Sequence, residues 1–141
     1  MKSKAPLILM EQMVMLLVFA LAAALCLQAF VKSDAVSCRS EARDQAILLV
    51  QTAAETIRHC GGDMGGALTQ AADILGADYA QGLLWMDYDE NWNPFPGGVY
   101  RLTAQGVPTE VPGLWTARVS VTEDGQEAPL FSVEIAWQGE G

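Results

Sequence analysis

Oxygen-bearing side chains recur at every second position along the segment 87–93. They belong to Asp87, Asp89, Asn91 and Asn93. Calcium-binding loops use oxygen ligands at similar spacing. However, the sixth position of such a loop requires glycine and the twelfth requires glutamate, and here these positions hold Trp92 and Gly98. The segment is therefore not an EF-hand. It favours an acidic, solvated turn over a calcium site, and no other cofactor is expected.

His59 is the single histidine of the chain, and Cys60 follows it directly. Neighbouring residues on a helix point about 100° apart, so these two side chains do not face each other. No serine partner is evident for His59, and the three cysteines show no metal-type spacing. We therefore expect a protein that is not an enzyme.

The charge distribution argues against nucleic acid as a partner. The chain has a net charge of −9, and from Ser33 onward five arginines face sixteen acidic residues, a net charge of −11. Such a field repels phosphate backbones.

Glu11 lies near the start of the apolar stretch Leu7 to Val31, in which the other polar residues are Gln12 and Gln28. About 20 mostly apolar residues suffice for a helix that spans the hydrocarbon core. Lys2 and Lys4 precede the stretch and acidic residues dominate after it. The positive-inside rule then predicts a single-pass protein of the cell membrane, with a cytoplasmic N-terminus and the rest outside.

Three simpler interpretations of this stretch stay open. A cleaved signal peptide would use the small residues at 22–24 or 29. A lipoprotein signal would need a small residue before Cys26, where Leu25 stands. A plain single-pass anchor would place Glu11 at the depth of the lipid headgroups.

The segment 33–60 reads as an amphipathic continuation of the same helix. Its apolar stripe follows helical spacing at Ala46, Val50, Ala53 and Ile57. No proline or glycine interrupts the chain between Leu7 and Cys60, and Gly61-Gly62 ends the helix. Cys38 and Cys60 would then lie roughly 33 Å apart along the axis, so free thiols or intermolecular pairing are expected.

The segment 61–141 predicts a short helix and an antiparallel sheet of about four strands. Asp63 can cap the helix, expected at about 65–75, and Gly76 ends it. Strands are expected at about 79–88, 98–104, 114–123 and 129–137, with an Asp124-Gly125 hairpin turn before the last. The apolar face of this sheet must cover the apolar stripe of the long helix, which gives an α+β fold.

The start of the chain resembles type IV pilins and the pseudopilins of type II secretion and competence systems. Lys2 and Lys4 match the short basic leader of that family, and Glu11 is the fifth residue counted from Leu7. The family has glycine before its cleavage site, whereas this sequence has Ala5-Pro6. The resemblance implies processing between Pro6 and Leu7, and an ion pair in the assembly between Glu11 and the Leu7 amine of a neighbouring subunit.

The resemblance also implies a pilin-like fold and a domain layout along the chain. Residues 1–6 would form the cytoplasmic leader, 7–32 the transmembrane half of the helix, 33–60 its amphipathic half and 61–141 the domain outside the membrane. The implied partners are other pilin-like subunits, an inner-membrane assembly platform and the lipid bilayer. The alternative function is that of an anchored or secreted binding module with no role in a filament.

Overall fold

The computed structural model describes residues 4–139, and Lys2 of the expected leader lies outside this range. Two helices come first, α1 (Ala5–Cys60) and α2 (Met64–Leu75). Five strands follow: β1 (Asp78–Ala80), β2 (Leu83–Tyr88), β3 (Tyr100–Val107), β4 (Leu114–Glu123) and β5 (Phe131–Gln138). The chain divides into two compact units between Ser40 and Glu41. We call residues 4–40 the stem and residues 41–139 the sheet domain.

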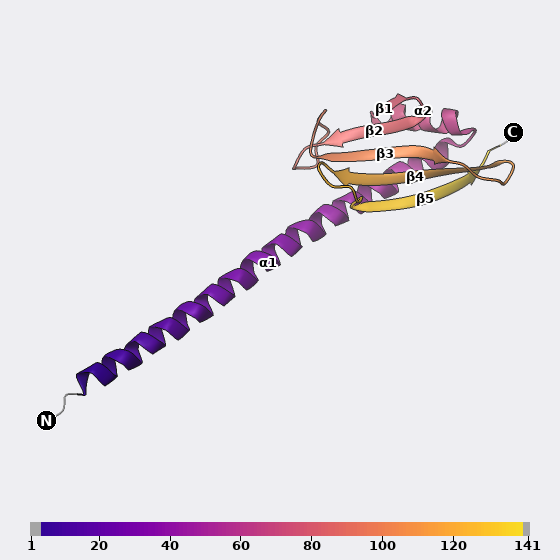
Figure 1. Ribbon diagram of the computed structural model, residues 1–141. Helices are drawn as coiled ribbons and strands as arrows, with labels where there is room; N and C mark the ends of the chain where they lie inside the picture. Colours follow the sequence, from indigo (N-terminus) through magenta and orange to yellow (C-terminus); the bar gives the residue numbers. More distant parts are fainter. Residues whose placement is uncertain (1–3, 140–141) are drawn as a thin grey trace. The chain divides into compact units, whose positions relative to one another are not determined.

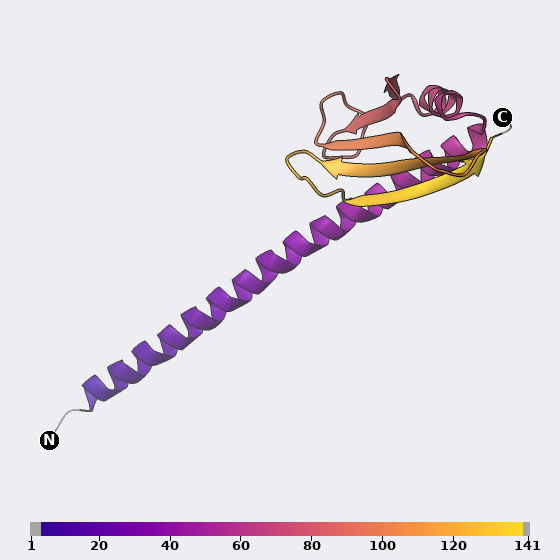
Figure 2. The ribbon, with the colours of Figure 1, turned by 45° about the vertical axis from the view of Figure 1, so that its right-hand side comes forward.

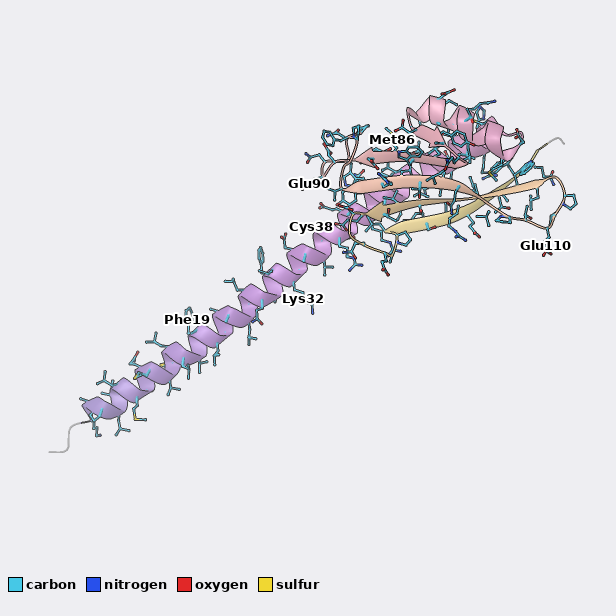
Figure 3. All side chains as sticks on the ribbon, turned by 45° about the horizontal axis from the view of Figure 1, so that its top comes forward. Phe19, Lys32, Cys38, Met86, Glu90 and Glu110 are labelled. Atoms are coloured by element: carbon cyan, nitrogen blue, oxygen red, sulfur yellow. The ribbon has the colours of Figure 1, made fainter. Side chains whose placement is uncertain are left out.

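The stem consists of α1 up to Ser40, preceded by Lys4. Every side chain in it is exposed in the single chain, and Figure 3 shows those of Phe19 and Lys32 projecting from the helix. Pro6 lies in the first turn, where its missing N–H breaks no helical hydrogen bond. By length and composition, α1 is one helix that could cross a membrane. The expected uninterrupted helix from Leu7 to Cys60 is confirmed, with its start two residues earlier.

The sheet domain contains a five-stranded meander in the order β1-β2-β3-β4-β5, antiparallel throughout (Figure 1). The expected count of about four strands is wrong by one. The segment 79–88 does not form one strand, because Gln81 and Gly82 both adopt positive φ angles, 52° and 81°. Two such residues in a row make a tight hairpin turn, which here pairs Ala80 with Leu83.

The remaining element boundaries lie close to those expected from the sequence. Gly61 ends α1 with a φ of 60°, and Gly76 ends α2 in the left-handed conformation. Asp63 occupies the N-cap position of α2 in an extended conformation, although its side chain makes no capping hydrogen bond. Strand β4 matches its predicted range, whereas β3 begins two residues later and runs three residues further than expected.

One hydrophobic core joins both helices to the sheet within this domain. The predicted stripe of α1 is confirmed, since Ala46, Val50, Ala53 and Ile57 are all fully buried. The sheet contributes alternate residues of its inner face to the same cluster, among them Leu84, Leu102, Ala104, Ala117, Val119 and Val121. Figures 1 and 2 both show the sheet lying across the second half of α1. The fold is thus an α+β arrangement of a long N-terminal helix packed against a small antiparallel sheet.

Candidate functional site: the start of the stem

Glu11 lies on the same side of α1 as Lys4 and Leu7. These three side chains, with Ile8, line one shallow hollow along the helix. Leu7 precedes Glu11 by four residues and Lys4 precedes it by seven. Positions with these spacings share a helix face, which explains why the three side chains lie together. The first turns of the stem therefore present one cation, one anion and apolar side chains on a single face.

Glu11 has no ion pair or hydrogen bond to any other side chain in residues 4–139. The residues before and after it in the chain, from Leu7 to Val18, are almost all large and apolar, and they are exposed in the single chain. A carboxylate among such residues is costly in a bilayer unless a cation neutralises it or it reaches the interface. Glu11 is thus a charged group whose partner, if it has one, comes from outside the described chain.

Pro6 and Leu7, the residues of the expected processing site, both lie inside the first turn of α1. The N–H of Ile8 donates to the carbonyl oxygen of Lys4, 3.2 Å away. The bond between Pro6 and Leu7 is consequently part of a helical turn in this chain. Whether a peptidase cuts there stays a prediction.

The calcium candidates lie in and beside the loop 89–99 between β2 and β3, but Asp87 already has a cation. Its carboxylate accepts hydrogen bonds from Arg101 Nε (2.6 Å) and Nη2 (3.0 Å), and from the backbone N–H of Gly97 (3.0 Å). The hydrogen bond from Arg101 is the main reason why the pKa of Asp87 is lowered below its ordinary value. A calcium ion at Asp87 would compete with this guanidinium for the carboxylate.

Asp89 holds the loop together in a different way. Its Oδ1 atom accepts hydrogen bonds from the backbone N–H groups of Asn91 and Asn93, both at 2.9 Å. Asn91 and Asn93 thus contribute main-chain donors to Asp89. Residues 4–139 contain no group of three or more His, Cys, Asp or Glu side chains placed to hold a metal ion. The two carboxylates serve as internal acceptors of the loop, and calcium binding stays a prediction.

Three residues whose structural role the sequence did not indicate complete this loop: Arg101, Trp92 and Gly98. Arg101 lies fourteen positions after Asp87, and the two become cross-strand neighbours only through the β2–β3 register. Trp92 has a φ of 64° and stacks on Tyr100, with ring centroids 3.9 Å apart. Gly98 allows the loop to close, because a Cβ atom there would collide with the carbonyl oxygen of Tyr88. The long-range pairing behind these contacts has no local sequence signal.

His59 and Cys60 do not assemble a nucleophilic site in the described part of the chain. His59 is exposed and lines a surface hollow with Glu55, Arg58 and Trp137. No serine, threonine or cysteine lines that hollow. All three cysteines, Cys26, Cys38 and Cys60, are free thiols.

Comparison of this chain with protein-family models, with curated proteins and with solved structures gives no match.

Proposed function

We propose that this protein is a membrane-anchored, pilin-like subunit, of the minor pseudopilin kind, in a type IV pilus, type II secretion or competence-type assembly. It acts without catalysis, through the packing of its stem against the stems of neighbouring subunits. Its partners are other pilin-like subunits, an inner-membrane assembly platform and the lipid bilayer.

The observation that carries this proposal is the position of Glu11 on a long helix. Glu11 is the one acidic residue between Lys4 and Ser33, and it has no ion pair within the described chain. A buried charge without a partner is strongly unfavourable, so an assembly that supplies a cation gains stability from it. The same residue would then fix the register between neighbouring stems.

The continuity of α1 supports the proposal. A single helix, Ala5–Cys60, carries an apolar first half and a second half whose stripe is buried under a sheet. A long helix of this kind with a small antiparallel sheet on its C-terminal half is the architecture that the resemblance to pilins implies. Lys4 before the apolar run and the acidic surplus after it favour a cytoplasmic N-terminus with the sheet domain outside.

The test is association of the full chain with itself in membranes. Two differently tagged full-length copies are produced together, extracted in mild detergent and purified through one tag. We expect Glu11→Gln to lower the recovery of the second copy by roughly fivefold or more, as for the loss of a coupled charge pair. Gln12→Ala, at the next position on a different side of the helix, is the matched control. Equal recovery of the second copy with Glu11→Gln and with wild type would contradict the proposal.

That outcome would favour the alternative, a single-pass anchored or secreted binding module with no filament role. The mass of the N-terminal peptide from native protein separates the cases further. A chain cut near Ala24 is a secreted module, whereas a chain beginning at Leu7 has been processed in the manner of a pilin. A chain beginning at Met1 keeps its whole stem.

A further inference from the structure

We propose that the free edge of β5 binds an extended, basic segment of another protein, which adds to the sheet as one more antiparallel strand. This inference goes beyond the proposed function and does not depend on it, because it concerns the sheet domain alone. β5 is the last strand in the order β1-β2-β3-β4-β5, and within residues 4–139 it pairs only with β4. Figure 2 shows it as the outermost strand on its side of the sheet.

The backbone of β5 presents a row of unused hydrogen-bonding groups along this edge. The N–H of Gly139 donates to the carbonyl oxygen of Gly113, 3.2 Å away, directly beyond the pair Leu114–Gln138. Alternate residues of an antiparallel strand bond to one neighbour, so the residues in between turn their N–H and C=O groups to the other side. We call these in-between residues the outward residues of β5: Ser132, Glu134, Ala136 and Gln138. No backbone hydrogen bond joins them to another element within residues 4–139.

The strand lacks the features that usually block an exposed edge. Natural sheets protect their edges with very short strands, prolines or lysines. The opposite edge follows this rule, because β1 has three residues, whereas β5 has eight and contains no proline, glycine or lysine. The pairing register of β5 with β4 runs without interruption from Phe131 to Gln138. Such an edge is a template for a further strand.

The hydrophobic core is incompletely covered along β5. Val119 of β4 is fully buried, whereas Val133, its partner on β5, is only half-buried. The next pair repeats this difference, since Ala117 is fully buried and Ile135 is half-buried. Apolar side chains at alternate positions of an added strand would cover this face. A surface hollow lined by Trp137 and by residues of α1 leaves room for them beside the end of β5.

The charge of the sheet domain selects the partner. Residues 41–139 contain fourteen acidic residues and four arginines, a net charge of −10. A second copy carries the same charge and is repelled, whereas a basic segment is attracted. Glu134 is the one charged residue of β5, and its side chain is about half exposed. Basic side chains opposite the outward residues would lie next to it. The segment that fits this edge therefore alternates apolar and basic residues.

The experiment measures amide hydrogen exchange by NMR on the full chain in detergent micelles. Before any addition, the amides of the outward residues should exchange at least roughly tenfold faster than those of Val133, Ile135 and Trp137, which face β4. The probe is an octapeptide of four Lys-Val repeats with blocked ends. Its addition should slow exchange of the outward amides by at least roughly tenfold, and a Glu-Val octapeptide should not.

Two methylated probes test the backbone pairing itself. In antiparallel addition, opposite residues share a face, so the lysine amides of the probe bond to the outward residues of β5. Methyl groups on the lysine amide nitrogens should abolish the protection, whereas methyl groups on the valine amide nitrogens should leave it intact. Ala136→Pro removes one outward N–H and should weaken the protection. Ala136→Val keeps this N–H and is the matched control.

Three outcomes would overturn the proposal. The first is equal protection by the two methylated probes, and the second is equal protection by the Lys-Val and Glu-Val peptides, including none by either. The third is slow exchange of the outward amides before any peptide is added, because a second copy would then occupy the edge. None of these outcomes changes the test of the stem through Glu11→Gln.

Discussion

The two parts of α1 have similar apolar residues and opposite environments. In the stem, Ile8 is 58% exposed and Val18 is 59% exposed, whereas Ile57 and Val50 in the sheet domain are fully buried. The buried stripe is narrow and accompanied by charged residues on the other sides, whereas the stem from Met13 to Val31 is apolar on every side apart from Gln28. A helix that is apolar on every side requires an apolar surrounding, such as lipid or other helices. The comparison identifies the stem as the part of the chain that still needs a surrounding.

The largest expected effect comes from shortening a buried isoleucine of α1. Ile57→Ala should lower the free energy of unfolding of the sheet domain by about 2–5 kcal/mol, because it leaves a cavity under the sheet. Ile8→Ala removes the same atoms from an exposed position of the stem and should leave that value unchanged. Denaturant unfolding followed by tryptophan fluorescence measures both. Equal losses would contradict the division of α1 into two environments.

A charge in the middle of the apolar run tests whether the stem inserts into a membrane. Leu17→Arg should oppose membrane insertion by about 2.5–3.5 kcal/mol, the cost of arginine at the centre of a membrane helix. The full chain should then move from the membrane fraction toward the soluble fraction on flotation. Leu48→Arg is the matched control, since Leu48 is an exposed leucine of α1 in the sheet domain. If both variants stayed with the membranes, the claim that the apolar run of the stem inserts into lipid would be contradicted.

The Asp87–Arg101 pair gives a smaller, pH-dependent effect. Asp87→Asn should cost about 1–2 kcal/mol of domain stability at pH 7, because a charge-assisted bidentate contact is lost. Arg101 lowers the pKa of folded Asp87 below its ordinary value of 3.8. The carboxylate therefore stabilises the fold fully above about pH 5, and this contribution disappears as pH falls through the lowered pKa. Thermal unfolding of the wild type and of Asp87→Asn, measured from pH 7 to pH 3, should show that the difference in stability between them shrinks as the pH falls.

The smallest effect is expected at the second ion pair of the sheet. Arg118 Nη2 lies 2.6 Å from Glu134 Oε1, but both side chains are about half exposed. Exposed pairs contribute little, so Glu134→Gln should change stability by less than about 1 kcal/mol, with a weak dependence on pH. A loss at pH 7 as large as that of Asp87→Asn would show that burial does not distinguish the two pairs.

Local patterns predicted the elements that depend on local chemistry. The stripe at Ala46, Val50, Ala53 and Ile57 and the glycines at 61 and 76 were sufficient to place both helices. The turn at Gln81-Gly82 was missed because glutamine is an unusual residue at positive φ. The Asp87–Arg101 contact depends on strand register, which no nearby residue specifies. At the stem, the sequence pointed to Glu11 and Leu7, and the structure shows that both line one hollow with Lys4. A single chain does not contain the partner of Glu11.

Thiol accessibility tests the central claim that the apolar part of the stem, residues 7–32, lies in a membrane. Cys26 and Cys38 are both exposed in the single chain, and on this account a bilayer covers Cys26 and leaves Cys38 in water. The full chain is placed in lipid nanodiscs, treated with a membrane-impermeant maleimide and mapped by peptide mass. The account predicts labelling of Cys38 and none of Cys26 until detergent replaces the lipid. Labelling of Cys26 in nanodiscs as fast as that of Cys38 would contradict it.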